Sequence, residues 1–245
     1  MLYPKNREDR LSAGLFRDPT AEYRCTPFWA WNCDLDDGLL NREIDYMKEM
    51  GMGGFHMHVR VGMSTPYLSD EFMGHIRNCI DKAKENDMLA WLYDEDKWPS
   101  GFAGGLVTKD EENRMKYLLF TPMSNEEAAA LGPDAPGASG KRTGKGRLIA
   151  VYDIILDKAG RLASYRRIGP DEKAQGKKWY AYMDATASSP WYNLQGYVDT
   201  MSPKAIRKFI DITHERYLEK AGDEFGKSVP AIFTDEPQMI CQTTL

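Results

Sequence analysis

Two acidic residues, Asp235 and Glu236, directly follow an apolar segment near the end of the sequence. A carboxyl group held at the end of a strand can donate a proton to a leaving group or remove one from water. We therefore predict Glu236 as a general acid or base, with Asp235 beside it in the same catalytic site. The alternative interpretation is an acidic strand end that faces solvent and takes part in no reaction.

Two histidines and an arginine form a second group. His56, His58 and Arg60 alternate with apolar residues over 53–60. Because alternate residues of a strand share a face, these three side chains are predicted to point the same way, toward a substrate. They could instead be structural groups, with Arg60 paired to a nearby carboxylate.

The densest group of polar residues is Asp-Glu-Asp-Lys-Trp-Pro-Ser-Gly at 94–101, which directly follows an apolar segment. Carboxylates accept hydrogen bonds from hydroxyl groups, and the face of an indole ring stacks on a sugar ring. We therefore predict that Asp94, Glu95 and Trp98 hold a carbohydrate. A charged surface loop with a buried Trp98 is the alternative.

Two further substrate contacts are predicted at the end of the aromatic segment Pro-Phe-Trp-Ala-Trp-Asn, residues 27–32. They are Trp31 and Asn32, although either Trp29 or Trp31 could belong to the core. His75 and His214 are expected on helices away from the site, as surface groups.

The segments that carry these groups are predicted to be strands of one sheet. Apolar runs at 27–32, 53–60, 88–93 and 229–237 each end in polar residues. Strands that alternate with helices predict a parallel sheet. The carboxyl ends of parallel strands lie at one edge, where α/β enzymes place their active sites. Four polar endings at that edge therefore predict one site.

Three helices are expected between these strands. The first begins after Asp36 or Asp37 and ends near Gly51, the second begins after Ser69, and the third begins at Ser202-Pro203. Helical spacing predicts their buried faces. These faces consist of Leu40, Ile44, Met47 and Met50; then Phe72, Ile76, Cys79, Ile80 and Ala83; then Ile206, Phe209, Ile210, Thr213 and Tyr217.

Residues 106–198 break the alternation. Strand-like runs occur at 117–120, 147–156, 161–168 and 178–183, and Asp157–Gly160 suits a hairpin turn between the middle two. A loop rich in Gly and Pro spans 132–146. This pattern predicts a small antiparallel insertion.

The expected organisation therefore has three parts. Residues 16–105 hold strands one to three, 106–198 hold the β-rich insertion, and 199–245 hold a helix and the fourth strand. A complete (β/α)8 barrel needs about 250 residues without insertions. We therefore expect a chain that is truncated after its fourth strand.

The charge, the length of the apolar runs and the cysteine spacing argue against several classes of protein. The 245 residues include 32 basic and 37 acidic side chains, a net charge of −5, which argues against a nucleic-acid partner. No apolar run approaches the ~18 residues of a membrane span, and the N-terminus lacks the apolar core of a secretory signal. The four cysteines form no CxxC pair. We expect a cytoplasmic protein that binds neither nucleic acid nor membrane.

Four motifs together resemble glycoside hydrolases like the α-L-rhamnosidases of family 106. The similar region runs from about residue 16 to 240 and keeps the motifs in order. The motifs are Pro27–Asn32, Gly54–His58 with Thr65–Ser69, Tyr93–Gly101 and Phe233–Pro237. The resemblance implies a TIM-type (β/α)8 barrel, of which this chain covers about the first four βα units. It also implies inverting hydrolysis of a glycosidic bond in a plant or microbial glycoside, and a calcium ion near the sugar.

The resemblance also implies the role of Glu236. In such barrels the general acid commonly lies at the end of strand four, which matches this residue. Inverting hydrolysis needs a second carboxylate ~6.5–9.5 Å away to activate water. Asp94, Glu95 or Asp96 could serve as that base, but the family pattern places it beyond Leu245.

Two other functions fit the same residues. A His-x-His pair on a barrel strand, with Asp235, could bind a metal ion in a metal-dependent hydrolase. A non-catalytic half-barrel could bind carbohydrate through its tryptophan and acidic residues, or could assemble with another chain. The number of subunits, the metal, the sugar and the linkage are not specified by the sequence.

Overall fold

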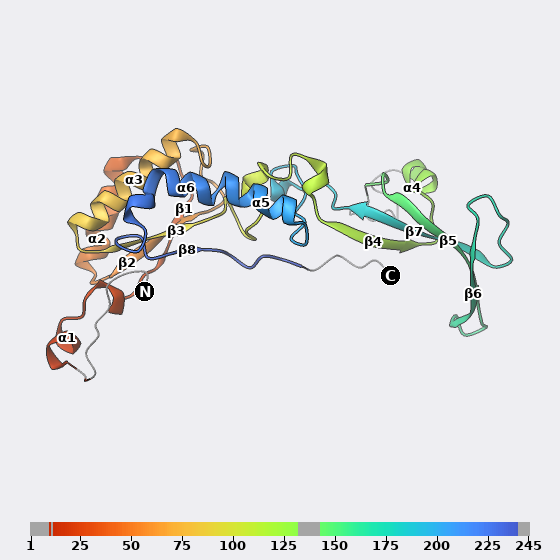
Figure 1. Cartoon of the computed structure of the whole chain (residues 1–245), viewed down its shortest axis with the longest axis horizontal. Helices are drawn as coiled ribbons and strands as arrows, with labels where there is room; N and C mark the ends of the chain where they lie inside the picture. Colours follow the sequence, from red (N-terminus) through yellow and green to blue (C-terminus); the bar gives the residue numbers. More distant parts are fainter. Residues whose placement is uncertain (1–9, 11, 132–142, 240–245) are drawn as a thin grey trace. The chain divides into compact units, whose positions relative to one another are not determined.

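The computed structural model describes residues 10, 12–131 and 143–239. The chain divides into two compact units. One consists of Met1–Leu106 with Arg207–Pro237, and the other consists of Val107–Ile206 with Gln238–Leu245. Each unit contains one four-stranded sheet, so the chain is a mixed α/β protein (Figure 1).

The first unit is built on a parallel sheet. Its strands are β1 (Phe28–Trp31), β2 (Gly54–Val59), β3 (Leu89–Tyr93) and β8 (Ile232–Phe233), in the order β1-β2-β3-β8. All three pairings are parallel, as the alternation of strands and helices predicts. The fourth strand is shorter than the predicted segment 229–237.

Helices cover one face of this sheet. They are α2 (Asp37–Glu49), α3 (Asp70–Glu85) and α6 (His214–Ala221), all on the same side of the strands in Figure 1. The side chains of Asp36 and Ser69 accept hydrogen bonds from the first turns of α2 and α3, so both predicted caps are confirmed. Met50 was predicted on the buried face but is 66% exposed, because α2 ends one residue earlier.

The predicted third helix is interrupted. It forms α5 (Pro203–Ile212) and α6, with Thr213 between them. The Thr213 hydroxyl donates to the Phe209 carbonyl oxygen at 2.6 Å, and that oxygen also accepts from the Thr213 N–H at 2.9 Å. Such a side-chain bond to the preceding turn bends a helix. The periodicity of the apolar residues continues through the bend and so gives no sign of it.

The parallel sheet is strongly curved. β1 and β8 are its two edge strands, yet the rings of Phe28 and Phe233 lie 5.0 Å apart. In a flat sheet the backbones of first and fourth strands are separated by about 14 Å. The two rings therefore meet across a concave face, opposite the helices. No closed barrel forms within the described ranges.

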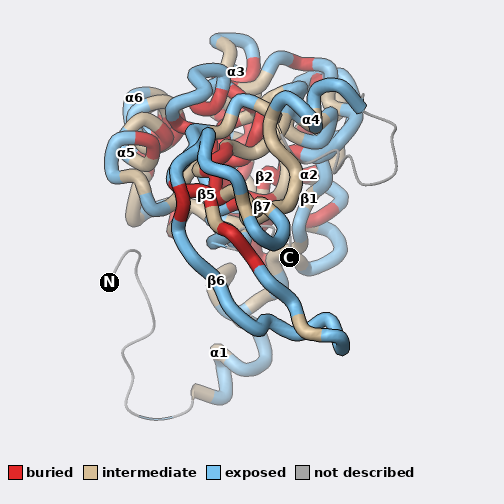
Figure 2. Tube along the Cα trace, turned by 90° about the vertical axis from the view of Figure 1, so that its right-hand side faces the viewer, coloured by how far each residue is buried: buried red, intermediate tan, exposed pale blue. Residues whose placement is uncertain are grey.

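The second unit contains the antiparallel sheet. Its strands are β4 (Lys116–Thr121), β5 (Arg147–Leu156), β6 (Leu162–Ile168) and β7 (Lys177–Ala185), in the order β4-β7-β5-β6. All four match predicted runs to within two residues. Asp157 caps the predicted hairpin turn by accepting from the N–H groups of Ala159 and Arg161. Figure 2 shows that β6 is exposed along almost its whole length.

The sequence pattern missed helix α4 (Asn125–Leu131) in this unit. Most of the predicted loop 132–146 lies outside the described residues. A short helix, α1 (Ala13–Arg17), precedes the parallel sheet. The 3₁₀ segments are Ala21–Tyr23, Ala103–Gly105, Glu111–Asn113, Pro190–Tyr192 and Gly222–Glu224.

Candidate functional site

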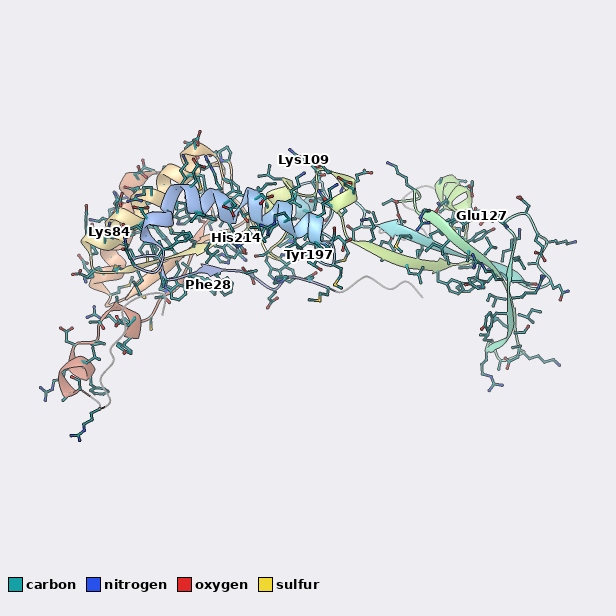
Figure 3. The ribbon with its side chains drawn as sticks, viewed as in Figure 1. Phe28, Lys84, Lys109, Glu127, Tyr197 and His214 are labelled. Atoms are coloured by element: carbon teal, nitrogen blue, oxygen red, sulfur yellow. The ribbon has the colours of Figure 1, made fainter. Side chains whose placement is uncertain are left out.

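The concave face of the parallel sheet carries aromatic and histidine side chains. The register pairs Phe28 with His56 and His56 with Trp91, so these three residues share a face. The ring centroids of Phe28 and His56 lie 4.9 Å apart, and the His56 ring stacks on Trp91 at 5.0 Å. Phe28 is 55% exposed and lies on the side away from the helices (Figure 3).

A hollow of ≈ 440 Å³ lies over the carboxyl ends of these strands. Four of the predicted site residues line it, and they come from two segments that are far apart in the sequence. The lining residues are Phe28, Ala30, His58, Arg60, Phe233, Asp235 and Glu236. The parallel arrangement thus brings His58 and Arg60 together with Asp235 and Glu236, as the strand-end argument predicts.

Glu236 is the exposed carboxylate of this hollow. Its Oε2 accepts a hydrogen bond from the Trp98 indole Nε1 at 2.9 Å. Its backbone has φ of 43°, in the left-handed region that side-chain-bearing residues rarely adopt. Such a conformation costs of order 1–3 kcal/mol and persists only where neighbouring contacts impose it. Glu236 is therefore held in place and open to solvent at the same time.

Asp235 is more enclosed than Glu236. The Tyr93 hydroxyl donates to its Oδ2 at 3.1 Å, and the His58 Nε2 lies 3.8 Å from the same oxygen. Burial and the Asp235 carboxylate both raise the pKa of Tyr93, which keeps the phenol protonated as a donor. One Asp235 oxygen is thus committed to the protein.

Both histidines of the concave face have lowered pKa values. Burial lowers the pKa of His56, and burial together with the Arg60 charge lowers the pKa of His58. The Asp235 carboxylate opposes this shift at His58. The Nδ1 atoms of both rings are buried and have no hydrogen-bond partner within the described residues. A neutral imidazole offers one donor and one acceptor, which suits sugar hydroxyls.

Asp94 lies beneath the site and not on its surface. It is fully buried, which corrects the prediction that it contacts substrate. Its Oδ1 accepts from the Ser100 hydroxyl and its Oδ2 from the Thr234 hydroxyl, each at 2.6 Å. The His214 Nε2 lies 3.4 Å from the same Oδ2. Both oxygens are engaged by the protein, so none is left for a sugar.

Glu95 is also buried and serves the loop that follows it. Its Oε2 accepts from the N–H groups of Gly101, Phe102 and Ala103 at 2.8–3.0 Å, and its Oε1 accepts from Asp96 and Gly104. Burial raises the pKa of Glu95 to about 8, while the N–H groups of Asp96, Gly101, Ala103 and Gly104 act in the opposite direction. The predicted sugar contact is therefore wrong for Glu95, because its carboxylate turns inward.

Trp31 belongs to the core. It is 2% exposed and packs against Trp29 and Phe72 on the helix-covered face. It has the opposite orientation to Phe28 and Ala30, since side chains alternate along β1. This corrects its predicted contact with substrate. Asn32, just after β1, is exposed.

His214 was predicted to be a surface group away from the site, and this is wrong. It begins α6 and lies beside Asp94, with its Nδ1 3.0 Å from the Thr213 hydroxyl. Figure 3 shows it close to the strands. Nothing in the local sequence marks this contact, because it depends on how the bent helix packs. His75 lies on α3 and contacts Asp37, as expected away from the hollow, but its side chain is only 13% exposed and so is not a surface group.

The sequence analysis also missed Phe28, Tyr93 and Phe233. They share the concave face with His58, and the period of two could have identified them. Once His58 is placed on that face, the register puts Ala30 beside it, and the ring of Tyr93 lies 4.1 Å from the His58 ring.

Within residues 10, 12–131 and 143–239, no three His, Cys, Asp or Glu side chains gather closely enough to hold a metal ion. The calcium ion that the resemblance implies stays a prediction.

Comparison with known proteins gives little further guidance. No family model matches the sequence, and no curated protein matches it. Among solved structures, a rhamnosidase from Novosphingobium sp. PP1Y is similar over 62% of this chain, with 19% identity and a TM-score of 0.40. This chain covers 17% of that protein. The similarity assigns no family. In the part of the chain that the structure describes, no helix is long and apolar enough to cross a bilayer.

Proposed function

We propose that this chain forms part of an inverting glycoside hydrolase that cleaves α-L-rhamnoside-like bonds, with Glu236 as the general acid. The observation that carries the proposal is the geometry of Glu236. Its carboxylate is exposed at the rim of a hollow lined by aromatic and basic side chains, and the Trp98 indole holds it there. A proton donor must be both accessible and oriented, and this residue is the acidic side chain of the hollow that meets both conditions.

The lining of the hollow supports a carbohydrate substrate. The exposed ring of Phe28 offers an apolar surface to the C–H face of a sugar. Arg60 and His58 offer donors, and the second oxygen of Asp235 offers an acceptor, to sugar hydroxyl groups. An apolar surface with a few polar groups is typical of small-molecule sites.

In the proposed reaction, protonated Glu236 donates its proton to the glycosidic oxygen as the bond from that oxygen to the anomeric carbon breaks. The leaving group departs as an alcohol. Water adds to the opposite side of the anomeric carbon and loses its proton to a second carboxylate ~6.5–9.5 Å from the first. We place this base outside residues 1–245. Asp235 binds the sugar and is itself fixed by Tyr93.

We further propose that the curved sheet is half of a (β/α)8 barrel. The contact between Phe28 and Phe233 supports a curvature in which inward side chains of the first and fourth strands meet. The helices lie on the convex face, as barrel helices do. β1 and β8 are edge strands among the described residues, and each could pair with a further strand.

The test replaces Glu236 by Gln in the full-length gene product and compares two α-L-rhamnosides. One carries a sugar or alkyl leaving group, which needs protonation to depart. The other carries a dinitrophenyl group, which leaves as a stable anion. We expect Glu236→Gln to reduce kcat on the first substrate by about 10²–10⁴-fold and on the second much less. Substrate binding should change little.

Glu49→Gln is the matched control, because Glu49 is exposed on the helix side of the sheet. It should leave both rates unchanged. Unchanged turnover in Glu236→Gln would exclude Glu236 as the acid. Sugar binding without turnover in the unmodified protein would favour the non-catalytic carbohydrate-binding module.

A further inference from the structure

The left-handed backbone of Glu236 requires contacts that hold it. These contacts come from the loop after β3. The Ser100 N–H donates to the Asp235 carbonyl oxygen, and the Asp235 N–H donates to the Ser100 hydroxyl, both at 2.8 Å. Ser100 therefore binds both the N–H and the carbonyl oxygen of Asp235, the residue that immediately precedes Glu236.

Asp94 connects Ser100 to the residue that follows β8. Its two carboxylate oxygens accept from the Ser100 hydroxyl and from the Thr234 hydroxyl. The buried Asp94 carboxylate thus binds both Ser100 and Thr234, the two residues in contact with Asp235 along the loop and along the chain. Trp98, in the same loop, holds the Glu236 side chain. We refer to Asp94, Trp98, Ser100 and Thr234 as the clamp.

We propose that the clamp positions the general acid, with buried Asp94 as its central positioning residue. This inference rests on the proposed function of Glu236. A carboxylate without solvent contact is retained in a protein only where its partners compensate for the lost hydration. Here the partners are two hydroxyl groups and His214, and both hydroxyls belong to the segments that set the backbone of Asp235 and Glu236. The charge of Asp94 therefore lies where it can fix the position of Glu236.

Thr234 offers the cleanest test, because it is exposed and tolerates substitution better than the buried members of the clamp. Thr234→Val keeps the shape of the side chain and removes the hydroxyl that donates to Asp94. Thr234→Ser keeps that hydroxyl. A misplacement of a catalytic group by about 1 Å can cost 10²-fold in rate. We expect Thr234→Val to lower kcat by about tenfold with KM within about twofold, and Thr234→Ser to stay within about twofold of the unmodified protein.

The leaving group separates positioning from a merely structural role. If Glu236 is displaced, the loss in Thr234→Val should be larger for an alkyl rhamnoside than for a dinitrophenyl rhamnoside, as in Glu236→Gln. A second variant, Ser100→Ala, removes the hydroxyl that binds both Asp94 and the Asp235 N–H. It should show the same pattern more strongly. Its fold is checked by circular dichroism and thermal unfolding.

The outcomes distinguish the two proposals. If Glu236→Gln abolishes turnover on the alkyl substrate while folded Thr234→Val and Ser100→Ala retain it, the clamp is overturned and the acid stands. An equal loss on both substrates also overturns the clamp. If Glu236→Gln retains turnover, the proposed function fails first. Rescue by Thr234→Ser, together with a leaving-group-dependent loss in Thr234→Val, supports the clamp.

Discussion

The ends of β3 and β8 carry the same two residue types, but their surroundings differ. Asp94 and Glu95 follow β3 and are fully buried, whereas Asp235 and Glu236 follow β8 and line a hollow. Each aspartate lies near a histidine, at 3.4 Å for Asp94 and 3.8 Å for Asp235. Strand ends of one sheet can thus provide a scaffold in one place and an accessible acid in the next.

The residues that follow each pair explain the difference. After Glu95 the chain turns back, and Gly101 and Gly104 adopt positive φ values of 133° and 59°. Such backbone directs successive N–H groups toward one point, where they bind an anion. After Glu236 comes Pro237, which has no N–H to offer. Glu95 is therefore enclosed by backbone donors, whereas Glu236 accepts from the side chain of Trp98.

The largest expected effect is a loss of stability on substitution of Glu95. Its absence would contradict the difference proposed between the two acidic pairs. Glu95→Gln replaces a carboxylate oxygen by an amide nitrogen, which cannot accept from the loop N–H groups. Each buried group that loses its partner costs about 1–3 kcal/mol. Because each Glu95 oxygen accepts at least two N–H bonds, we expect a loss of about 3 kcal/mol in the free energy of unfolding, measured with urea above pH 8, where Glu95 is a carboxylate.

Glu236→Gln provides the matched control for this measurement. It is the same substitution at an exposed carboxylate with one hydrogen bond from Trp98. Substitutions at exposed positions usually change stability by less than about 0.5 kcal/mol. Equal losses in the two variants would show that the acidic pairs do not differ in structural role.

The contrast between the two acidic pairs also shows which features of the fold and the site could be predicted from the sequence. Periodicity and capping residues predicted the parallel strands, the faces of α2 and α3, and the four strands of the antiparallel sheet, because these signals are local. The gathering of His58, Arg60, Asp235 and Glu236 followed from the rule that parallel strands end at one edge. Burial of Asp94 and Glu95 could not be predicted, since the donors to Glu95 are backbone groups that any residue carries.

Contacts between distant segments were the other part that could not be predicted. His214 reaches Asp94 only because the helix bends at Thr213, and no change in apolar spacing marks that bend. Trp31 was placed at the site because it stands beside Asn32. Its true position follows from alternation along β1, which turns it toward α3 and Phe72.

The pH dependence of stability sharpens the comparison further. Burial raises the pKa of Glu95 to about 8 in the folded protein, well above the ordinary value for a glutamate of about 4.3. The folded state then binds more protons than the unfolded state between these values, so stability falls as the pH rises. We expect a fall of about 1 kcal/mol per pH unit between pH 6.5 and 8.

The two concave-face histidines act in the opposite direction and at lower pH. Their lowered pKa values make the folded state bind fewer protons below about pH 6.5, so their contribution is lost as the pH falls. Urea unfolding between pH 6.5 and 8 therefore reports mainly on Glu95. Glu95→Gln should remove the slope, and a slope that persists in this variant would assign it to another group.

The smallest expected effect concerns the histidine beside the accessible pair. Asp235 raises the pKa of His58, whereas burial and Arg60 lower it. Asp235→Asn should therefore lower the pKa of His58 further, and Arg60→Gln should raise it. Each change should be of the order of one pH unit, because His58 is buried and its Nε2 lies 3.8 Å from the Asp235 oxygen. Titration of the imidazole by NMR measures both. Shifts of the same sign in the two variants would show that His58 responds to burial alone, and that the charges over β8 do not act as a coupled group.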